Sequence, residues 1–342
     1  MKKSIHNDYN HNNAILSKQE YSNQSITGAT PKTLLDYIGQ ENLIQRLLVY
    51  INSAKQRKTA ADHMLFFGPP GLGKTTLAEI VANELGQKLK STSGPLLQKT
   101  SDIVSVLNNI KIGDIIFIDE IHRLSMPCAE ILYTAMEQFK IDILLGNGNA
   151  AKIVTIPLPP FTLIGATTKL GTIPNPLRSR FGIIEKFDWY SEQSLATIIT
   201  YTLHYFQISI TSDTALKIAQ ASRGTPRIAK KLAFKIRDFS FAKGITSITE
   251  EIINEAFQFF HITPNGLTDT DIAILKILYE KKHPVGIESI RAILNEEKDT
   301  IEEVYEPFLI QLGYIERTPR GRILDSNKID KIKKIIYDHF MI

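Results

Sequence analysis

Cysteine is almost absent from this chain: Cys128 is the only one among 342 residues. A single cysteine excludes a disulfide framework and a zinc site built from cysteines, and it fits a reducing compartment. Long apolar runs are also missing, since no window approaches the roughly 18 residues that a membrane-spanning helix needs. The residues after Met1-Lys2-Lys3 are polar, unlike those of a signal peptide. We therefore expect a soluble, cytoplasmic protein.

The chain also lacks a large excess of charge of either sign. Lys and Arg total 40 against 36 for Asp and Glu, which leaves a net charge of +4. That charge permits an acidic partner such as nucleic acid without demanding one. The length predicts two or three domains. Residues 1–28 are rich in Asn, Ser, Gln and Lys and have no periodic apolar positions, so we predict a disordered tail.

After the tail, short apolar runs alternate with helical patterns. The strands are expected at 63–67, 88–92, 115–118 and 161–166, and the helices at 41–57, 75–85, 96–107 and 127–139. Buried strands separated by helices predict a parallel sheet with helices on both faces. We expect this α/β domain to span residues 29–190.

The segment 140–157 interrupts the alternation. Two β-like halves flank Gly146-Asn147-Gly148-Asn149, a strong turn signal that predicts a hairpin. The hairpin carries many apolar residues, which leaves two interpretations open. It either folds onto its own domain or forms a docking surface for a partner protein.

Two smaller domains are predicted after the α/β domain. Residues 191–263 are helical throughout, which indicates a small all-α domain. Residues 264–342 begin with a linker, and Asp299 with Glu302 resembles a capping box for the last of three helices. These helices are expected at 271–281, 287–294 and 300–312.

A hairpin is predicted at 314–324, with its turn at Pro319–Gly321. Three helices followed by a hairpin are the outline of a winged helix. Arg317, Arg320 and Arg322 lie in this wing, and alternation places Arg320 and Arg322 on one face. Positive groups there suit contact with phosphate or the minor groove, although a solvated basic turn is the alternative. The preceding helix is acidic, so we expect the wing, and not that helix, to contact DNA.

The stretch Gly68–Thr75 matches the phosphate-loop pattern G-x-x-x-x-G-K-[ST], with an apolar strand before it and a helix after it. The glycines let backbone N–H groups turn toward phosphates, and the helix N-terminus adds partial positive charge. We expect Lys74 to reach the β- and γ-phosphates and the Thr75 hydroxyl to coordinate Mg²⁺. The chain therefore binds a nucleoside triphosphate.

Two carboxylates, Asp119 and Glu120, follow the apolar run 115–118. Charge at the end of a buried strand is costly unless it has a task. We assign Asp119 to the shell of the Mg²⁺ ion and Glu120 to polarising the attacking water as general base. The strand 161–166 ends in hydroxyls, of which Thr168 is placed to sense the γ-phosphate or position water.

Two arginine motifs follow. Arg178 and Arg180 are flanked by apolar residues. They are either a solvated surface pair or the source of an arginine finger that reaches a neighbouring subunit's ATP, a contact worth roughly 10³–10⁵ in rate. Arg227 follows Pro226 at the first turn of a helix. It either belongs to a capping turn or reaches back to the γ-phosphate.

In order and spacing, these motifs resemble the AAA+ ATPases. More narrowly, they are similar to the RuvB family of bacterial Holliday-junction branch-migration motors, over about residues 31–324. The stretches that carry the resemblance are HMLFFGPPGLGKTTLA (63–78), IIFIDEIHRLS (115–125), LPPFTLIGATT (158–168), PLRSRFGI (176–183), RGTPRIAKKL (223–232) and RTPRGR (317–322).

The resemblance implies a role for each matching position. Hydrolysis would rest on Lys74, Asp119, Glu120, Thr168 as sensor 1 and Arg180 as a finger in trans. Nucleotide binding would involve Ala29, Thr30, Tyr37, Ile38, Gly71, Leu72, Gly73, Lys74, Thr75, Thr76, Glu137, Gln138, Phe139, Arg180, Tyr190 and, as sensor 2, Arg227. Thr75 and Asp119 would hold the metal, and Arg317, Arg320 and Arg322 would contact DNA. At Thr30 the family usually has Arg, so one contact there would be missing.

The resemblance also implies cofactors and partners. The cofactors would be ATP or ADP with Mg²⁺. The partners would be the duplex arms of Holliday-junction DNA, RuvA bound at the 140–157 hairpin, RuvC within the resolvasome, and further copies of the chain in a hexamer. The implied function is the motor of the RuvAB complex in recombination, DNA repair and the SOS response.

Two other classes of function compete with this one. The first is another AAA+ machine. Clamp loaders often carry a cysteine zinc module, which the single cysteine excludes. Unfoldases usually carry an aromatic pore loop and a recruiting N-terminal domain, where this chain has only the predicted tail. The second is a non-enzymatic, ATP-sensing DNA-binding regulator. The intact Glu120 and Arg180 argue against it.

Overall fold

A computed structural model describes residues 30–145 and 152–340. The predicted disordered tail, 1–28, and the predicted turn at 146–149 lie outside these residues. By their contacts, the residues form two compact units. The first holds the chain up to Gly68, Gly73–Asp188 and Tyr205–Gln207, and the second holds Pro69–Leu72, Trp189–His204 and the chain from Ile208 onward. In the described part of the chain, no helix is long and apolar enough to cross a membrane.

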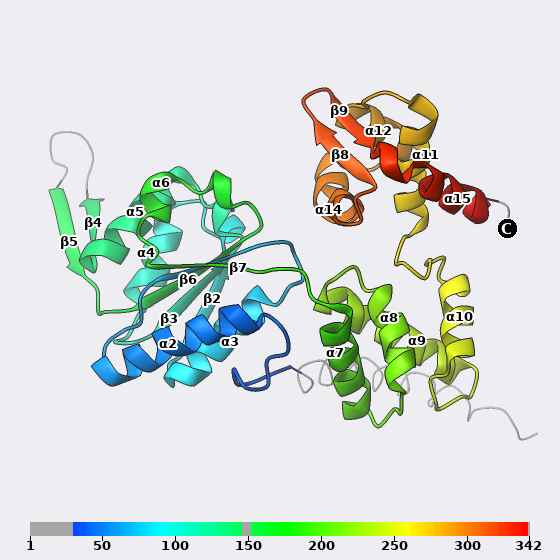
Figure 1. Cartoon of the computed structure of the whole chain (residues 1–342). Coiled ribbons are helices and arrows are strands. Elements are labelled where there is room, and N and C mark those ends of the chain that lie inside the picture. Colours follow the sequence, from blue (N-terminus) through cyan, green and yellow to red (C-terminus); the bar gives the residue numbers. More distant parts are fainter. Residues whose placement is uncertain (1–29, 146–151, 341–342) are drawn as a thin grey trace, which may run out of the picture. The chain divides into compact units, whose positions relative to one another are not determined.

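A five-stranded parallel sheet lies at the centre of the first unit (Figure 1), in agreement with the predicted alternation. The strand order is β2-β3-β6-β1-β7. The strands are β1 Met64–Phe67, β2 Leu89–Ser93, β3 Ile115–Asp119, β6 Thr162–Thr167 and β7 Ile183–Lys186. We call the side where these strands begin the amino edge, and the side where they end the carboxyl edge.

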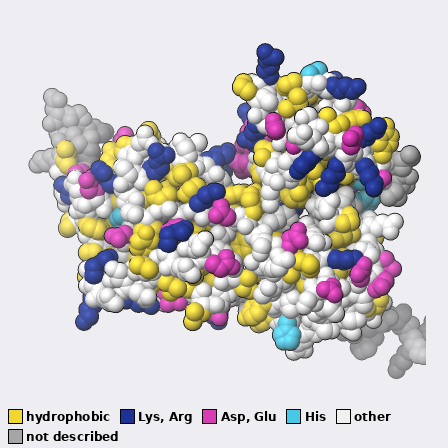
Figure 2. Space-filling model, viewed as in Figure 1, with side chains coloured by type: hydrophobic (Ala, Val, Ile, Leu, Met, Phe, Trp, Pro, Cys, Tyr) yellow, Lys and Arg dark blue, Asp and Glu magenta, His cyan; other side chains and the backbone are white. Residues whose placement is uncertain are grey.

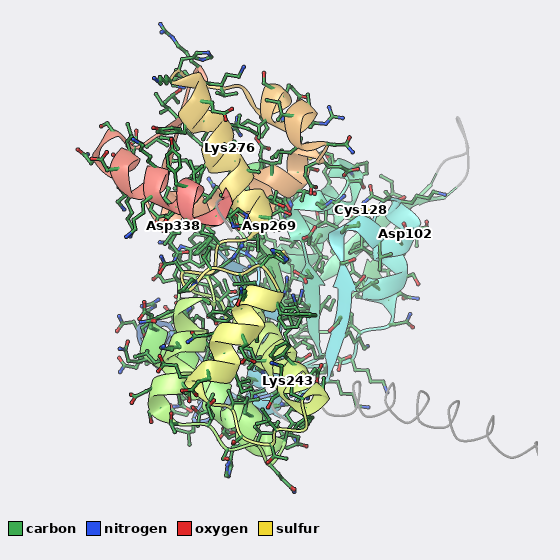
Figure 3. The ribbon with its side chains drawn as sticks, turned by 90° about the vertical axis from the view of Figure 1, so that its right-hand side faces the viewer. Asp102, Cys128, Lys243, Asp269, Lys276 and Asp338 are labelled. Atoms are coloured by element: carbon green, nitrogen blue, oxygen red, sulfur yellow. The ribbon has the colours of Figure 1, made fainter. Side chains whose placement is uncertain are left out.

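Helices cover the sheet because successive side chains of a buried strand point to opposite faces. The helices of this unit are α2 Glu41–Arg57, α3 Lys74–Leu85, α4 Thr100–Asn108, α5 Met126–Gln138 and the short α6 Asn175–Arg178. Leu65 and Leu163 share a core with α4, α5 and α6, while α3 packs against β2, β3 and β6, and α2 packs on α3. Cys128, labelled in Figure 3, is buried in the α4–α5 layer.

Most of these helices lie where they were predicted, and α3 ends at a left-handed Gly86 as expected. The helix predicted at 96–107 is wrong at its start. It begins at Thr100, because the Asp102 carboxylate accepts a hydrogen bond from the Lys99 N–H at 2.9 Å and so caps the first turn. Gly94–Leu96 forms a separate 3₁₀ turn.

The predicted hairpin is present as β4 Lys140–Leu145 and β5 Lys152–Pro157, which pair antiparallel. Its base folds onto the domain: Ile141 is buried, and Ile143 and Ile156 pack against the core shared by α4 and α5. Farther out, Ile153 is 71% exposed and Val154 is 40% exposed. The first interpretation therefore holds for the base of the hairpin, and the docking surface stays a prediction for its outer part.

The second unit contains four helices between the two predicted domain boundaries, each introduced by local chemistry. They are α7 Glu192–Tyr205, α8 Ser212–Gln220, α9 Pro226–Ala242 and α10 Glu250–Phe259. Thr211, Thr225 and Thr249 cap α8, α9 and α10 through their hydroxyls. We call this part of the chain the lid.

The rest of the second unit is a winged helix. Its first two helices are α11 Asp269–Lys281 and α12 Ile287–Leu294. The hairpin consists of β8 Ile315–Thr318 and β9 Gly321–Leu324, as predicted. A final helix, α15 Ile329–Phe340, was not predicted. It packs on α11, and His339 Nε2 lies 3.2 Å from the Asp269 carboxylate.

The third helix of the wing domain differs from its prediction. It begins at Lys298 with Glu297 as N-cap, so the predicted capping box at Asp299 is wrong. It passes through a π turn, Ile301–Tyr305, before α14, Glu306–Gln311. Pro307 explains the wider turn, because it has no N–H to donate to the carbonyl of the preceding turn.

Candidate functional site

The carboxyl edge of the sheet is where ligands bind in open α/β folds. Gly68 follows β1 there with φ of 145°, and a Cβ at this position would lie 2.7 Å from the Phe187 carbonyl oxygen. Gly73 then caps α3 in a left-handed conformation. Lys74 is buried, and its Nζ donates to the Gly68 carbonyl at 2.8 Å. The loop is therefore folded around the ammonium group, with the N-terminus of α3 beside it.

The hydroxyl-bearing residues of the loop occupy the first turn of α3. Thr75 is exposed and Thr76 is half-buried. Free N–H groups at a helix start attract anions. Thr75 is therefore open to a ligand at the end of the helix that would face phosphates.

Asp119 and Glu120 close β3 at the same edge. The Asp119 carboxylate accepts from the Glu120 N–H at 2.9 Å. Glu120 is in the left-handed region, with φ of 48°, a conformation that costs a non-glycine residue of order 1 kcal/mol or more. Gly94 is packed so closely that a Cβ on it would lie 2.3 Å from the Glu120 carbonyl oxygen. The neighbouring strand end thus holds Glu120 in this unusual conformation.

The end of β6 lies between β3 and β1, beside both preceding groups. The Thr167 hydroxyl is buried and occupied: it lies 3.0 Å from His122 Nδ1 and accepts from the Lys169 N–H. Thr168, the residue selected from the sequence, is half-buried just beyond the strand. Its neighbour is thus structural, which leaves Thr168 as the hydroxyl suited to a ligand. The sequence analysis did not identify His122.

Arg180 lies at the amino edge, not at the carboxyl edge. It lies three residues before Ile183, the first residue of β7, which donates its N–H to the His63 carbonyl where β1 begins. Arg180 Nη2 pairs with Glu137 of α5 at 2.7 Å, and its buried Nε has no hydrogen-bond partner in the described chain. The length of β1, on the order of 10 Å, separates this arginine from the phosphate loop of its own subunit.

Gln138 and Phe139 follow Glu137 at the amino edge. Phe139 has φ of 48° as the cap of α5, and its ring lies edge-on to Phe161. Its ring also approaches that of His63. Three predicted nucleotide residues, Glu137, Gln138 and Phe139, are thus grouped with Arg180 and kept away from the loop of the same subunit.

The segment before α2 holds the predicted Thr30, Tyr37 and Ile38, each half-buried. Gln40 anchors its end by hydrogen bonds to the backbone of Asp188, at 2.6 and 3.2 Å, just after β7. This attachment places the segment beside the carboxyl end of the edge strand. Ala29 lies outside the described residues.

The remaining predicted nucleotide residues belong to the second unit. Gly71 has φ of 82°, and its carbonyl accepts from the Arg227 N–H at 3.3 Å. The Tyr190 hydroxyl lies 3.4 Å from the Leu72 carbonyl. A Cβ on Gly71 would come within 3.0 Å of Arg227 Cβ, so only glycine fits here. The structure thus brings Gly71, Leu72, Tyr190 and Arg227 together.

The wing arginines, Arg317, Arg320 and Arg322, are not alike. Glu306, only 1% exposed, receives hydrogen bonds from Arg317 Nε at 2.7 Å and Arg322 Nε at 2.6 Å. Burial lowers the pKa of Arg322, but its bonds to Glu306 and Glu302 outweigh burial and raise that pKa overall. Arg320 is exposed in the turn. Alternation placed Arg320 and Arg322 on one face, but of these two only Arg320 is exposed, because Arg322 pairs with Glu306 of α14.

Glu302 and Glu306 accept hydrogen bonds from Arg322, a role that the sequence analysis did not identify. The prediction that their helix does not contact DNA stays a prediction. Their spacing of four residues on the helix before an arginine-rich hairpin was the available signal. On the face drawn in Figure 2, the winged-helix domain shows charges of both signs. The charge on this face alone therefore does not mark it as a DNA-binding face.

The donor set can be tested against a magnesium ion. Among the described residues, no group of three or more His, Cys, Asp and Glu side chains could hold a metal. Magnesium, however, usually binds through one or two protein oxygens together with substrate phosphates and water. The half-buried Asp119 and the exposed Thr75 hydroxyl fit that pattern.

Comparison with known proteins gives one consistent result for all three parts of the chain. Residues 29–187 match the family described as Holliday junction DNA helicase RuvB P-loop domain. Residues 190–263 match the RuvB AAA lid domain, and 264–333 match the RuvB C-terminal winged helix domain. The three matches follow one another without overlap.

Solved structures agree with these matches. The Thermotoga maritima RuvB Holliday junction branch migration motor is 41% identical, with a TM-score of 0.81, over 89% of this chain and 98% of that one. A variant of the same protein with serine in place of an alanine is 42% identical, with a TM-score of 0.82 over the same shares. A variant with glycine in place of a proline gives 42% and 0.81.

Proposed function

The chain belongs to the RuvB family, and from that premise we propose how its residues drive branch migration of Holliday junctions. It is a nucleotide-binding AAA+ ATPase with a winged-helix domain. The observation that carries this function is the series of three consecutive RuvB domains, which together cover residues 29–187 and 190–333. The alternative, another AAA+ machine, is not favoured.

For hydrolysis, we assign the carboxyl edge to binding and activation. Lys74 would grip the β- and γ-phosphates, and Thr75 and Asp119 would hold Mg²⁺, which would neutralise phosphate charge. Glu120 accepts a proton from the attacking water, and Thr168 orients that water or the γ-phosphate. The left-handed conformation of Glu120 supports this role, because strain of this kind collects at working sites.

Arg180 completes the site of a neighbouring copy. Its position at the amino edge supports action in trans, since the length of β1 separates it from its own phosphate loop. Glu137, which pairs with Arg180, would approach the same neighbouring nucleotide together with Gln138 and Phe139. This arrangement requires a neighbouring copy, and we propose that the copies form a hexameric ring.

The second unit would report the nucleotide state. Arg227 and Tyr190 contact the loop residues Gly71 and Leu72, so a phosphate bound by that loop lies within reach of the lid. Thr30, Tyr37, Ile38 and, outside the described residues, Ala29 would border the base.

The DNA and protein partners are assigned to two surfaces. Arg317, Arg320 and Arg322 would contact the backbone of a junction's duplex arm. The exposed Ile153 and Val154 of the hairpin suit an apolar partner surface, for which we propose RuvA. RuvC would join within the resolvasome.

The test is a branch-migration assay on a synthetic four-way junction, with and without ATP and RuvA. We expect ATP-dependent conversion of the junction that RuvA stimulates. Lys74→Ala serves as the negative control, because it removes the phosphate-binding ammonium. A chain that hydrolyses ATP but never moves a junction, with RuvA present, would contradict the proposal.

A further inference from the structure

A buried ion pair joins the lid to the winged helix within the second unit. Arg223, in the turn between α8 and α9, donates from Nη2 to Asp271 of α11. The Arg223 side chain is 9% exposed and that of Asp271 is 0% exposed. Two charges withdrawn from water contribute little net stability, but they favour one arrangement of the groups that meet there.

The Arg223 guanidinium contacts the linker and two helices of the winged-helix domain. Nε donates to the Gly266 carbonyl at 2.8 Å, and Nη2 approaches the Thr268 hydroxyl at 3.4 Å. The plane lies 4.8 Å from the centre of the Phe308 ring of α14. One lid side chain thus contacts the linker, the first helix and the third helix.

Asp271 accepts hydrogen bonds from the start of its own helix as well as from Arg223. Its Oδ2 accepts from the Thr268 N–H at 2.7 Å and from the Thr268 hydroxyl at 2.6 Å, which forms the capping box of α11. Its Oδ1 is buried and has no hydrogen-bond partner among the described residues. The carboxylate therefore depends on Arg223 for compensation of its charge.

Arg223 also lies four residues before Arg227, which contacts the phosphate loop. The intervening turn is tightly packed: Arg223 itself has φ of 52°, and a Cβ on Gly224 would lie 2.9 Å from Gln311 Nε2 of α14. Thr225 then caps α9, whose first turn donates to the Gly71 carbonyl. A short, fully packed segment thus runs from the nucleotide loop to the winged helix.

We propose that Arg223 is a positioning residue that fixes the winged helix to the lid, so that lid movement at Gly71 is transmitted to the wing. This inference rests on the proposed function. Domains joined by a short linker with a small polar interface move relative to one another by default. The ion pair between Arg223 and Asp271 restricts this relative movement. It does so four residues from Arg227, which contacts the phosphate loop.

Arg223→Lys tests the proposal in the full-length chain. Lysine keeps the charge but cannot donate to Gly266 and Asp271 while lying flat on Phe308. Arg237→Lys is the matched control, because Arg237 also pairs with an aspartate, Asp238, and lies 4.8 Å from a ring, that of Phe234, but within one helix of the lid. Phe308→Leu is a second variant, which keeps the ion pair and removes the ring face.

Two readouts separate positioning from folding. The first is branch migration per ATP hydrolysed, which we expect to fall about tenfold in Arg223→Lys, within the range of ordinary couplings, while basal ATPase stays near the parent value. The second is the width of the distance distribution between spin labels at Lys231→Cys and Lys281→Cys, with Cys128→Ser as background. We expect a narrow distribution in the parent and Arg237→Lys and a broad one in Arg223→Lys.

The outcomes distinguish the inference from the function on which it rests. An Arg223→Lys chain that matches the parent in both readouts overturns the inference, and so does a parallel loss of ATPase and migration with an unchanged distance distribution. If Arg223→Lys does not fold, Phe308→Leu decides by the same two readouts, with a smaller expected effect. If the parent hydrolyses ATP but moves no junction, the proposed function fails. The spin-label distances would still show whether Arg223 fixes the winged helix to the lid.

Discussion

At the carboxyl edge of the five-stranded sheet, Lys74, Asp119 and Thr168 gather around the phosphate loop or beside it, each placed by the end of a strand or the start of a helix. At the amino edge, Arg180 pairs with Glu137. The two groups lie at opposite edges of the same sheet. The difference supports the proposal that one copy carries two halves of different sites, each of which a neighbouring copy would complete.

The strongest test of this comparison is Arg180→Ala. If Arg180 acts on a neighbour, we expect the pure variant to lose about 10³–10⁵ in ATP turnover, measured as steady-state phosphate release. Arg178→Ala is the matched control, because Arg178 is bonded to Asn175 on the surface of α6 and should change turnover little.

Mixing distinguishes a finger from a structural arginine. Arg180→Ala copies retain an intact carboxyl edge, and Lys74→Ala copies retain an intact amino edge. We expect a mixture of these two inactive variants to recover part of the ATPase activity. A mixture as inactive as either variant alone would mean that Arg180 does not act across a subunit boundary.

Glu120→Gln tests the other edge with a somewhat smaller effect. The amide keeps the size of the side chain but cannot accept a proton, so we expect turnover to fall about 10²–10⁴-fold with nucleotide affinity retained. Single-turnover hydrolysis and equilibrium binding of ATP measure the two quantities. Glu130→Gln, an exposed position on α5, is the control. Normal turnover in Glu120→Gln would remove it from the role of general base.

The carboxyl edge was predictable from the sequence because its chemistry is local. Gly68, Lys74 and Asp119 are fixed by short motifs and by strands whose apolar runs are visible in the chain. β7 was missed because only alternate residues of this edge strand are buried, and one of them is Glu185, which pairs with Arg46 of α2. A buried glutamate argues against a strand until its distant partner is known.

The wing illustrates the same limit. Arg322 and Glu306 are 16 residues apart, and their contact depends on hairpin register and on a π turn that Pro307 introduces. No local pattern reports that register. The sequence therefore supplied the basic hairpin, but not the carboxylate that holds two of its three arginines.

Within the wing, Arg322 is paired with Glu306 whereas Arg320 is exposed, so their substitution should have different effects. Arg320→Ala should lower the salt dependence of DNA affinity by about one unit of slope and leave stability unchanged, since Arg320 is exposed. Arg322→Ala should in addition destabilise the domain by about 3 kcal/mol, because it leaves the buried Glu306 with only one partner.

The measurements are a salt titration of duplex binding and thermal unfolding. Arg291→Ala, which removes a surface pair with Glu288 on α12, is the control for loss of one positive charge. A stable Arg322→Ala variant with the same slope change as Arg320→Ala would show that the two arginines are equivalent after all.

The smallest expected effect is the contribution of His63, at the amino edge, to the pH dependence of stability. His63 is buried, its Nδ1 accepts from the Leu163 N–H at 2.9 Å, and its Nε2 lies 3.1 Å from the Met136 carbonyl. This pattern needs a neutral ring. Burial lowers the pKa of His63, and the bond to Met136 opposes that shift only in part.

The unfolded chain therefore takes up the His63 proton at a higher pH than the folded one. The stabilising contribution is complete above the ordinary histidine pKa of about 6.5 and is lost as pH falls below it toward the folded value. The slope is at most about 1.4 kcal/mol per pH unit for one proton. Thermal unfolding midpoints across this range should fall less steeply in His63→Gln than in the parent, whereas His204→Gln, at an exposed lid position, should leave the slope unchanged. Equal slopes in the parent and His63→Gln would mean that this ring does not control the acid stability of the amino edge.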